Sequence, residues 1–121
     1  MEALVERTSD ALGQLSPFLR STFDALDAFR DLETRPNKAP GGFMLQFDLE
    51  RRPFIFSNSE GVHQDIITLL HESGHAFHTV LGAERSPVAG MRPPIEFAEV
   101  ASMAMELLPL PYIDAFYPDP A

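Results

Sequence analysis

The sequence of 121 residues contains no cysteine and few basic side chains. Without cysteine the chain can form no disulfide, and any metal site must be built from histidine and carboxylate groups. Nine Lys and Arg residues stand against 18 Asp and Glu residues, which gives a formal net charge of −9. Nucleic acids and anionic membranes both bind basic surfaces, so we expect neither as a partner.

Long apolar runs are also missing. No apolar stretch approaches the roughly 18 residues that a membrane-spanning helix needs, and the first residues lack the basic start and apolar run of a secretory signal. We therefore expect a cytoplasmic protein. The overall apolar share of 45% is ordinary for a globular chain, and the length suits a single domain with a modest core.

Hydrophobic spacing predicts a mainly α fold with a small β-hairpin. Apolar residues recur at helical intervals over 2–15 and again over 17–32, whereas Phe43, Leu45 and Phe47 alternate with their neighbours as in a strand. Within one domain, 1–121, the predicted segments are helices at 1–34, a loop and β-hairpin at 35–61, a helix at 62–82, a proline- and glycine-rich crossing at 86–94, a helix at 93–108 and an irregular tail at 109–121.

The most informative stretch reads His71-Glu72-Ser73-Gly74-His75. On a helix, positions i and i+4 share a face, so His71 and His75 can direct two imidazoles at one ion while Glu72 lies beside it. Two histidines at this spacing with an adjacent glutamate are typical of zinc peptidases.

A catalytic zinc site needs a third protein ligand and keeps one position for water. The crossing is long enough to bring the helix at 93–108 back antiparallel against the motif helix. Gly74 suits a close contact there, because glycine in mid-helix is otherwise costly. The sequence leaves several candidates for the third ligand: His63, His78, Glu96, Glu99 and Glu106.

Four segments together resemble the thimet oligopeptidase and oligoendopeptidase F group of zinc metallopeptidases, most closely its oligoendopeptidase F branch. The segments are Lys38-Ala39-Pro40-Gly41-Gly42, Pro53-Phe54-Ile55-Phe56, His71-Glu72-Ser73-Gly74-His75-Ala76-Phe77-His78 and Glu96-Phe97-Ala98-Glu99-Val100-Ala101-Ser102. They occur in the family's order and at close to its spacing.

The resemblance implies a zincin-like metallopeptidase core that hydrolyses short peptides. It assigns His71, His75 and Glu99 as the ligands of one Zn²⁺ ion and Glu72 as the general base. Glu96 and Glu106 match positions where the family often has acidic residues.

The chain departs from this family in length, since family members have several hundred residues. It is therefore either an excised piece of a larger enzyme or a short relative, and it lacks the family's downstream His and Tyr segment. Alternatives to a peptidase are a zinc-binding module without hydrolysis and a helical scaffold with a vacant motif. We expect unmatched apolar surface to require a partner, either a second copy in a homodimer or the rest of a larger enzyme. The surface expected to need it comprises the hairpin, Phe97, Met103, Met105 and Leu107.

Overall fold

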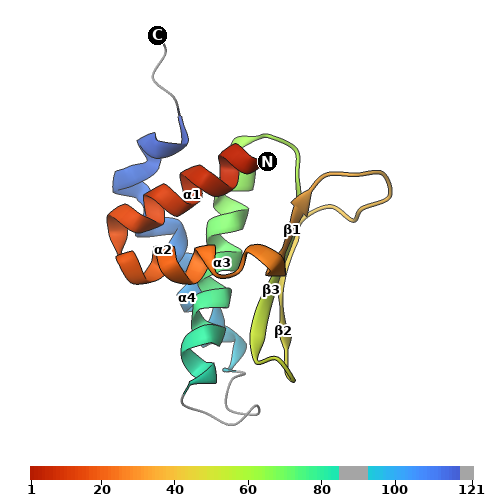
Figure 1. The fold of residues 1–121 in the computed structure, drawn as a ribbon, viewed down its shortest axis with the longest axis vertical. Coiled ribbons are helices and arrows are strands. Elements are labelled where there is room, and N and C mark those ends of the chain that lie inside the picture. Colours follow the sequence, from red (N-terminus) through yellow and green to blue (C-terminus); the bar gives the residue numbers. More distant parts are fainter. Residues whose placement is uncertain (85–92, 118–121) are drawn as a thin grey trace.

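A computed structural model describes residues 1–84 and 93–117 and contains four α-helices, two 3₁₀ helices and three strands within those ranges (Figure 1). In chain order these are α1 (Glu2–Leu15), α2 (Pro17–Asp24), η1 (Asp27–Phe29), β1 (Arg30–Glu33), β2 (Gly42–Phe47), β3 (Arg52–Ser59), α3 (His63–Ala83), α4 (Ile95–Leu107) and η3 (Leu110–Phe116). Most of the predicted crossing at 86–94 lies outside the described residues. Across the described part of the chain, none of the helices has the length and apolarity needed to traverse a bilayer.

Helix α3 is the centre of the molecule (Figure 1). The sheet packs on it through β2 and β3, and α4 contacts it more extensively than any other element. Helices α1 and α2 lie on the side away from the sheet. The core is apolar on both sides of α3, where Leu12 and Phe23 from the first two helices, Ile55 from β3, and Leu69 and Leu70 from α3 are all buried.

The sheet has three strands in the order β1-β3-β2, with β2 antiparallel to β3 as the predicted hairpin requires. The prediction of helix through residue 32 was wrong, because α2 ends at Asp24 and Arg30–Glu33 form a strand parallel to β3. This short segment has little local strand preference, so its pairing with β3 and the burial of Leu32 decide its conformation. The tail predicted to be irregular also differs, since residues 110–116 form the 3₁₀ helix η3.

The start of α3 is fixed by Asp65. One carboxylate oxygen, Oδ2, accepts hydrogen bonds from the backbone N–H groups of Glu60, Gly61 and Val62 at 2.9, 2.6 and 2.9 Å. A carboxylate in the first turn also interacts favourably with the positive end of the helix dipole. Because the helix begins at His63, the motif at residues 71–75 lies in mid-helix and is held rigidly.

Helices α3 and α4 run antiparallel and touch at Gly74. A Cβ atom on Gly74 would lie 2.6 Å from the Cα of Ser102 and 2.7 Å from the carbonyl oxygen of Ala101. Both neighbours are backbone atoms, so any side chain at this position would push the helices apart. The predicted close contact at Gly74 is therefore confirmed, and it brings α4 within reach of the motif histidines.

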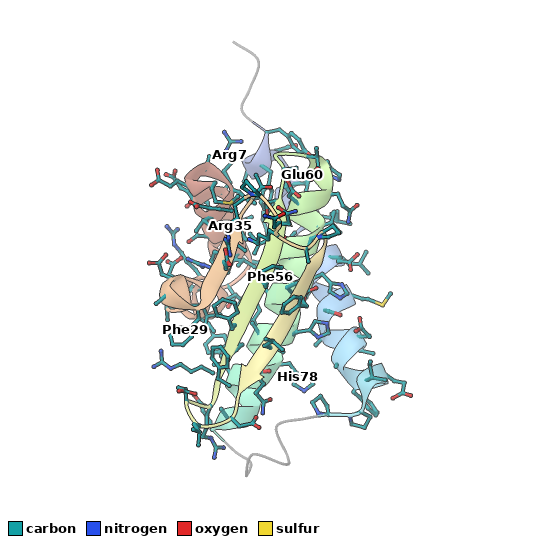
Figure 2. All side chains as sticks on the ribbon, turned by 90° about the vertical axis from the view of Figure 1, so that its right-hand side faces the viewer. Arg7, Phe29, Arg35, Phe56, Glu60 and His78 are labelled. Carbon is teal, nitrogen blue, oxygen red and sulfur yellow. The ribbon has the colours of Figure 1, made fainter. Side chains whose placement is uncertain are left out.

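Two faces of the molecule are apolar and open. On the sheet, Phe43 stacks on Phe56 with ring centroids 4.7 Å apart, and Phe47 lies 5.6 Å from Phe54. Figure 2 labels Phe56 on the side of the sheet away from α3. The alternate residues of the same strands, such as the fully buried Ile55, lie on the opposite face, which packs on α3. This open face belongs to the hairpin that we expected to need a partner. On α4 the exposed apolar residues are Ile95, Phe97, Val100, Met103 and Leu107. Met105, which we expected to need a partner, is buried in the core.

Candidate metal centre

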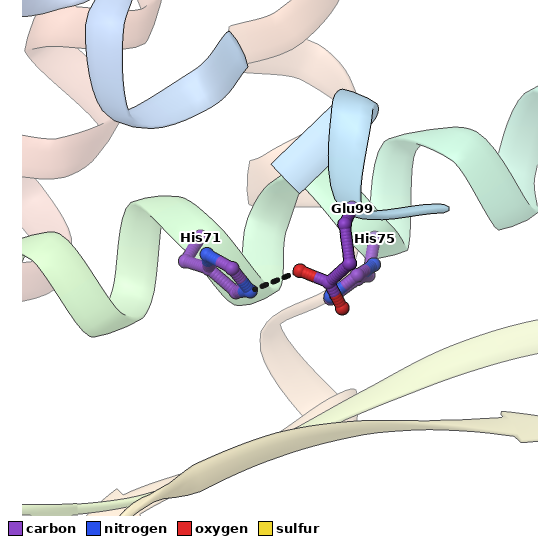
Figure 3. A group of neighbouring side chains, drawn as sticks. All are labelled: His71, His75 and Glu99. Atoms are coloured by element: carbon purple, nitrogen blue, oxygen red, sulfur yellow. Dashed lines mark ion pairs between the residues drawn. The ribbon is translucent and has the colours of Figure 1, made fainter. Parts of the chain in front are cut away.

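Helices α3 and α4 bring His71, His75 and Glu99 together (Figure 3). The Nε2 atom of His71 lies 3.3 Å from Oε2 of Glu99, and the Nε2 atom of His75 lies 3.5 Å from Oε1 of the same carboxylate. One donor atom from each of the three residues can be chosen so that all lie within 4.8 Å of one another. The two imidazole rings are nearly perpendicular, at 78°.

These separations are of the size found between ligands of one metal ion. Ligand atoms about 2.0–2.1 Å from a zinc ion lie roughly 3.4 Å apart at a tetrahedral angle, and the contacts of His71 and His75 with the two oxygens of Glu99 are 3.3 and 3.5 Å. Two histidines and one glutamate are also a ligand set found in catalytic zinc sites. Each of the three side chains is partly exposed, which leaves an approach for a further ligand.

Two residues of α4 contact the candidate ligands from outside the group. Glu106 Oε1 lies 2.5 Å from Nδ1 of His71, on the side of the ring away from Glu99. The hydroxyl of the buried Ser102 lies 3.0 Å from both Oε2 and the backbone oxygen of Glu99. Sequence analysis gave Glu106 only as a candidate third ligand and missed Ser102. Their spacing of three and seven residues from Glu99 was the available signal, because it places all three on one helix face.

Glu72 is buried beside the group, with 8% of its surface exposed. Burial raises the pKa of its carboxyl group, and the charge of Glu99 raises it further while His71 acts in the opposite direction. Burial lowers the pKa of His75, which favours the neutral imidazole that binds metals. The environment thus suits a proton acceptor at Glu72 and a ligand at His75.

The remaining candidates from the sequence are not part of this group. The His63 ring stacks on Tyr117 at the start of α3, and its Nδ1 makes a hydrogen bond with the Tyr117 hydroxyl. His78 lies one turn beyond His75, and its buried Nδ1 has no hydrogen-bond partner among the described residues. Glu96 is exposed at the start of α4.

A cleft of about 380 Å³ opens beside His75. Its walls come from β2, α3 and the start of α4, and its lining includes Leu45, Gln46, His78 and Ile95. A larger cavity of about 730 Å³ lies around the start of α3 and includes His63 and Tyr117 but neither motif histidine. Of these two cavities, the smaller one is next to a candidate ligand, because His75 lines it.

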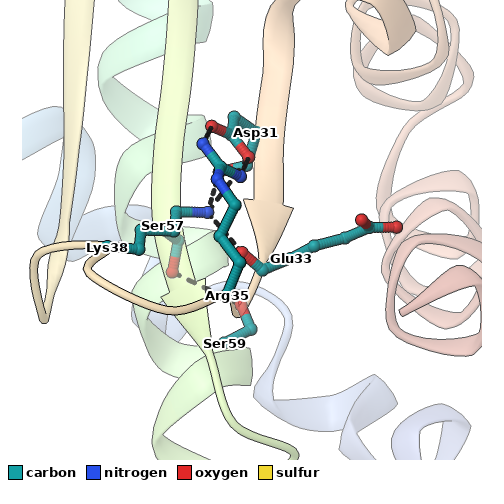
Figure 4. Close-up of polar contacts among 6 residues, drawn as sticks. All are labelled: Asp31, Glu33, Arg35, Lys38, Ser57 and Ser59. Atoms are coloured by element: carbon teal, nitrogen blue, oxygen red, sulfur yellow. Dashed lines mark hydrogen bonds and ion pairs between the residues drawn. The ribbon is translucent and has the colours of Figure 1, made fainter.

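A polar cluster holds the loop before β2 in place (Figure 4). The Lys38 side chain is only 1% exposed, and its Nζ donates to Asp31 Oδ1 at 3.0 Å and to the backbone oxygen of Glu33 at 2.6 Å. Arg35 donates to both carboxylate oxygens of Asp31 at 2.8 and 2.6 Å. These contacts join the loop to β1.

Strand β2 lies close to α3 where it begins. At Gly42, an added Cβ would lie 2.6 Å from the Thr68 side chain of α3.

Known proteins share both the sequence pattern and this fold. Residues 24–114 match peptidase family M3. Oligoendopeptidase F of Lactococcus lactis subsp. cremoris is 29% identical over 93 residues, which cover 77% of this chain and 15% of that protein.

Two solved structures superpose closely. One is described as an oligoendopeptidase F from Bacillus anthracis strain Ames, with a TM-score of 0.90, 30% identity and coverage of 96% of this chain and 22% of the other. The other is PZ peptidase A with an inhibitor, with a TM-score of 0.90, 30% identity and coverage of 97% and 21%. This chain thus spans about a fifth of these solved relatives.

The predicted mainly α, zincin-like core is confirmed by this likeness, with a third strand added to the hairpin. The matched region contains β1 to α4 and all three candidate ligands. The chain belongs to peptidase family M3.

Proposed function

We propose that this chain is the catalytic-core portion of a zinc-dependent metalloendopeptidase, an oligopeptidase that hydrolyses peptide bonds in short peptides. The observation that carries the proposal is the convergence of His71, His75 and Glu99 from two helices, with one donor atom from each within 4.8 Å of the others, and two His with one Glu are a ligand set of catalytic zinc sites. We propose these three as the ligands of a single Zn²⁺ and Glu72 as the general base. Membership of peptidase family M3 supports the reaction class.

A zinc ion bound at this site would act as a Lewis acid that acidifies a water molecule and polarises the scissile carbonyl. Glu72 would accept the proton of the attacking water and return it to the leaving amine. A general base works best when its pKa lies near the working pH, and burial raises the pKa of Glu72 in that direction. His75, kept neutral by burial, would offer its Nε2 lone pair without first losing a proton.

The cleft beside His75 suggests how a short peptide would bind. Strand β2 is at the edge of the sheet in the described structure, and Met44, Leu45 and Gln46 form one wall of the cleft. An extended peptide can add to such an edge through main-chain hydrogen bonds, with side-chain pockets giving selectivity. The peptide would then pass His75, which places a scissile bond near the metal centre.

A zinc-binding module without hydrolysis is the second candidate. The chain spans about a fifth of its solved relatives. Peptide hydrolysis also needs a hydrogen-bond donor near the metal that stabilises the negatively charged oxygen of the transition state. The Tyr117 hydroxyl is hydrogen-bonded to His63. His63 lies eight positions before His71 on α3, which corresponds to a rise of about 12 Å along the helix. As placed in the described structure, Tyr117 is therefore too far from His71 to act as that donor.

One set of measurements on the purified chain separates the two candidates. Zinc is counted per chain by mass spectrometry, and cleavage of a quenched fluorogenic peptide is followed for wild type, Glu72→Gln and His75→Ala. We expect about one zinc in wild type and Glu72→Gln, loss of stoichiometric zinc in His75→Ala, and cleavage by wild type but by neither of these two variants. Glu96→Gln, the same change at an exposed site, serves as the control.

The outcomes are distinct. Bound zinc with no cleavage that depends on Glu72 supports the non-catalytic module. Loss of zinc in Glu72→Gln would make Glu72 a ligand, and full activity in that variant would remove it from the mechanism. Full zinc content in His75→Ala contradicts the proposed ligand set.

A further inference from the structure

The two ring nitrogens of His71 face two different carboxylates. Nδ1 lies 2.5 Å from Glu106 Oε1, and Nε2 lies 3.3 Å from Glu99 Oε2. A histidine that binds a metal ion through Nε2 must be neutral and carry its one proton on Nδ1. The contact with Glu106 gives that proton an acceptor. Nε2 and the Glu99 carboxylate then face each other as two acceptors, and a metal ion between them would bind both.

Glu99 is held by a residue of its own helix. The Ser102 hydroxyl lies 3.0 Å from Glu99 Oε2 and 3.0 Å from the Glu99 backbone oxygen. Ser102 is fully buried, at the point where Gly74 allows α3 and α4 to touch. Its position is therefore fixed by packing, and a hydrogen bond from a fixed hydroxyl restricts the rotamers of the Glu99 carboxylate.

We propose that Ser102 and Glu106 are positioning residues for the metal centre: Glu106 sets the tautomer and ring orientation of His71, and Ser102 fixes the Glu99 carboxylate. Glu99, Ser102 and Glu106 occupy positions i, i+3 and i+7 of α4 and therefore share one helix face. That face supplies the proposed ligand Glu99 and the hydrogen-bond partners of Glu99 and His71. This inference rests on the proposed zinc site. Partners of this kind make the ligands more basic and hold them in the orientation that binds the metal. Loss of one such partner typically weakens metal binding about 10- to 100-fold.

The test compares zinc affinity by competition with a chromogenic chelator in wild type, Glu106→Gln, Ser102→Ala and Glu96→Gln. Glutamine keeps the shape of Glu106, so the fold is retained while the charge-assisted hydrogen bond is lost. We expect zinc binding to weaken about 10- to 100-fold in Glu106→Gln and to a smaller extent in Ser102→Ala. Glu96→Gln removes the same charge from an exposed position of the same helix and is expected to stay within about twofold of wild type.

A second readout follows the ring itself. Nitrogen-15 NMR of the zinc-free protein, at a pH high enough for the imidazole to be neutral, reports which nitrogen of His71 carries the proton. We expect the Nδ1–H form in wild type and Glu96→Gln, and a mixture of tautomers in Glu106→Gln. A merely structural role for Glu106 would leave this ratio unchanged.

The results distinguish this inference from the function on which it rests. If wild type binds one zinc and Glu106→Gln binds it equally well with the same tautomer, the positioning role is overturned while the zinc site remains. An equal loss of affinity in Glu96→Gln would also overturn it, because net charge would then explain the effect. If wild type binds no zinc, the proposed function and this inference fail together.

Discussion

Replacing Gly74 by alanine tests whether the metal centre depends on the contact between α3 and α4. The added Cβ would lie 2.6 Å from the Cα of Ser102, whereas carbon atoms pack at about 3.5–4.0 Å. The helices must therefore separate by roughly 1 Å. Overpacking of this kind costs about 1–3 kcal/mol, and the better helix propensity of alanine returns up to about 1 kcal/mol. We expect a net loss of up to about 3 kcal/mol in the free energy of unfolding.

The same displacement should weaken zinc binding. Glu99 is on α4 and both histidines are on α3, so separating the helices changes every distance between the carboxylate and the imidazoles. Metal–ligand distances tolerate about 0.2 Å, far less than the expected movement. We expect zinc affinity to fall at least about tenfold, measured by chelator competition alongside urea denaturation of the zinc-free chain.

Gly13→Ala provides a matched control, because Gly13 is also within a helix. A Cβ there would meet the Arg20 side chain, with Cδ at 2.8 Å, and a flexible exposed arginine can move aside. Gly13→Ala should be neutral or stabilising by up to about 1 kcal/mol and should leave zinc affinity unchanged. Equal behaviour of the two variants in both assays would refute the argument that the helix contact sets the site geometry.

Two further predictions concern the fold around the site. Arg35 and Lys38 lower the pKa of Asp31, so its contribution to stability is present above the ordinary aspartate pKa of about 3.9 and is lost as the pH falls below that value. Asp31→Asn should therefore cost about 1–3 kcal/mol at pH 7, and its difference from wild type should shrink below pH 4 in denaturant titrations. Asp27→Asn, at a carboxylate that is 90% exposed, should show neither effect, and a gap that stays constant with pH would contradict the reasoning. The purified chain should also self-associate at micromolar concentration through its open apolar faces, and Val100→Glu should weaken this in light scattering; a wild-type monomer that binds no hydrophobic dye would contradict it.

The parts of the fold that could be predicted from the sequence are those with local signals. The motif helix has helical spacing, and Asp65 caps its first turn. Glycine at position 74 of the sequence also predicted the close contact with α4. Glu99 was one of five candidates by spacing, and only the resemblance to a family selected it. The structure brings it to the two histidines because the antiparallel contact at Gly74 sets the register of α4.

The errors came from contacts distant in sequence. Strand β1 contains one buried apolar residue, Leu32, and its pairing with β3 has no local signature. In the hairpin, the face with Phe43 and Phe47 points away from α3, and this is apolar surface that we expected to need a partner. Alternation predicts that a strand has two different faces, but it does not say which face meets the helices when both could be buried.

The open apolar faces belong to the same elements that carry the proposed chemistry. Val100 and Met103 are exposed on α4, whereas Glu99 of the same helix lies in the candidate metal site and accepts a hydrogen bond from Ser102. Strand β2 likewise has an open apolar face and also borders the cleft beside His75. Covering α4 would therefore do more than bury apolar area, because it would oppose any drift of the helix away from α3. We expect conditions that promote association of the chain to raise its zinc affinity as well, since both depend on the position of α4. Zinc titration at increasing chain concentration measures this coupling, and an affinity independent of concentration across the association range would show that the contact at Gly74 holds α4 by itself.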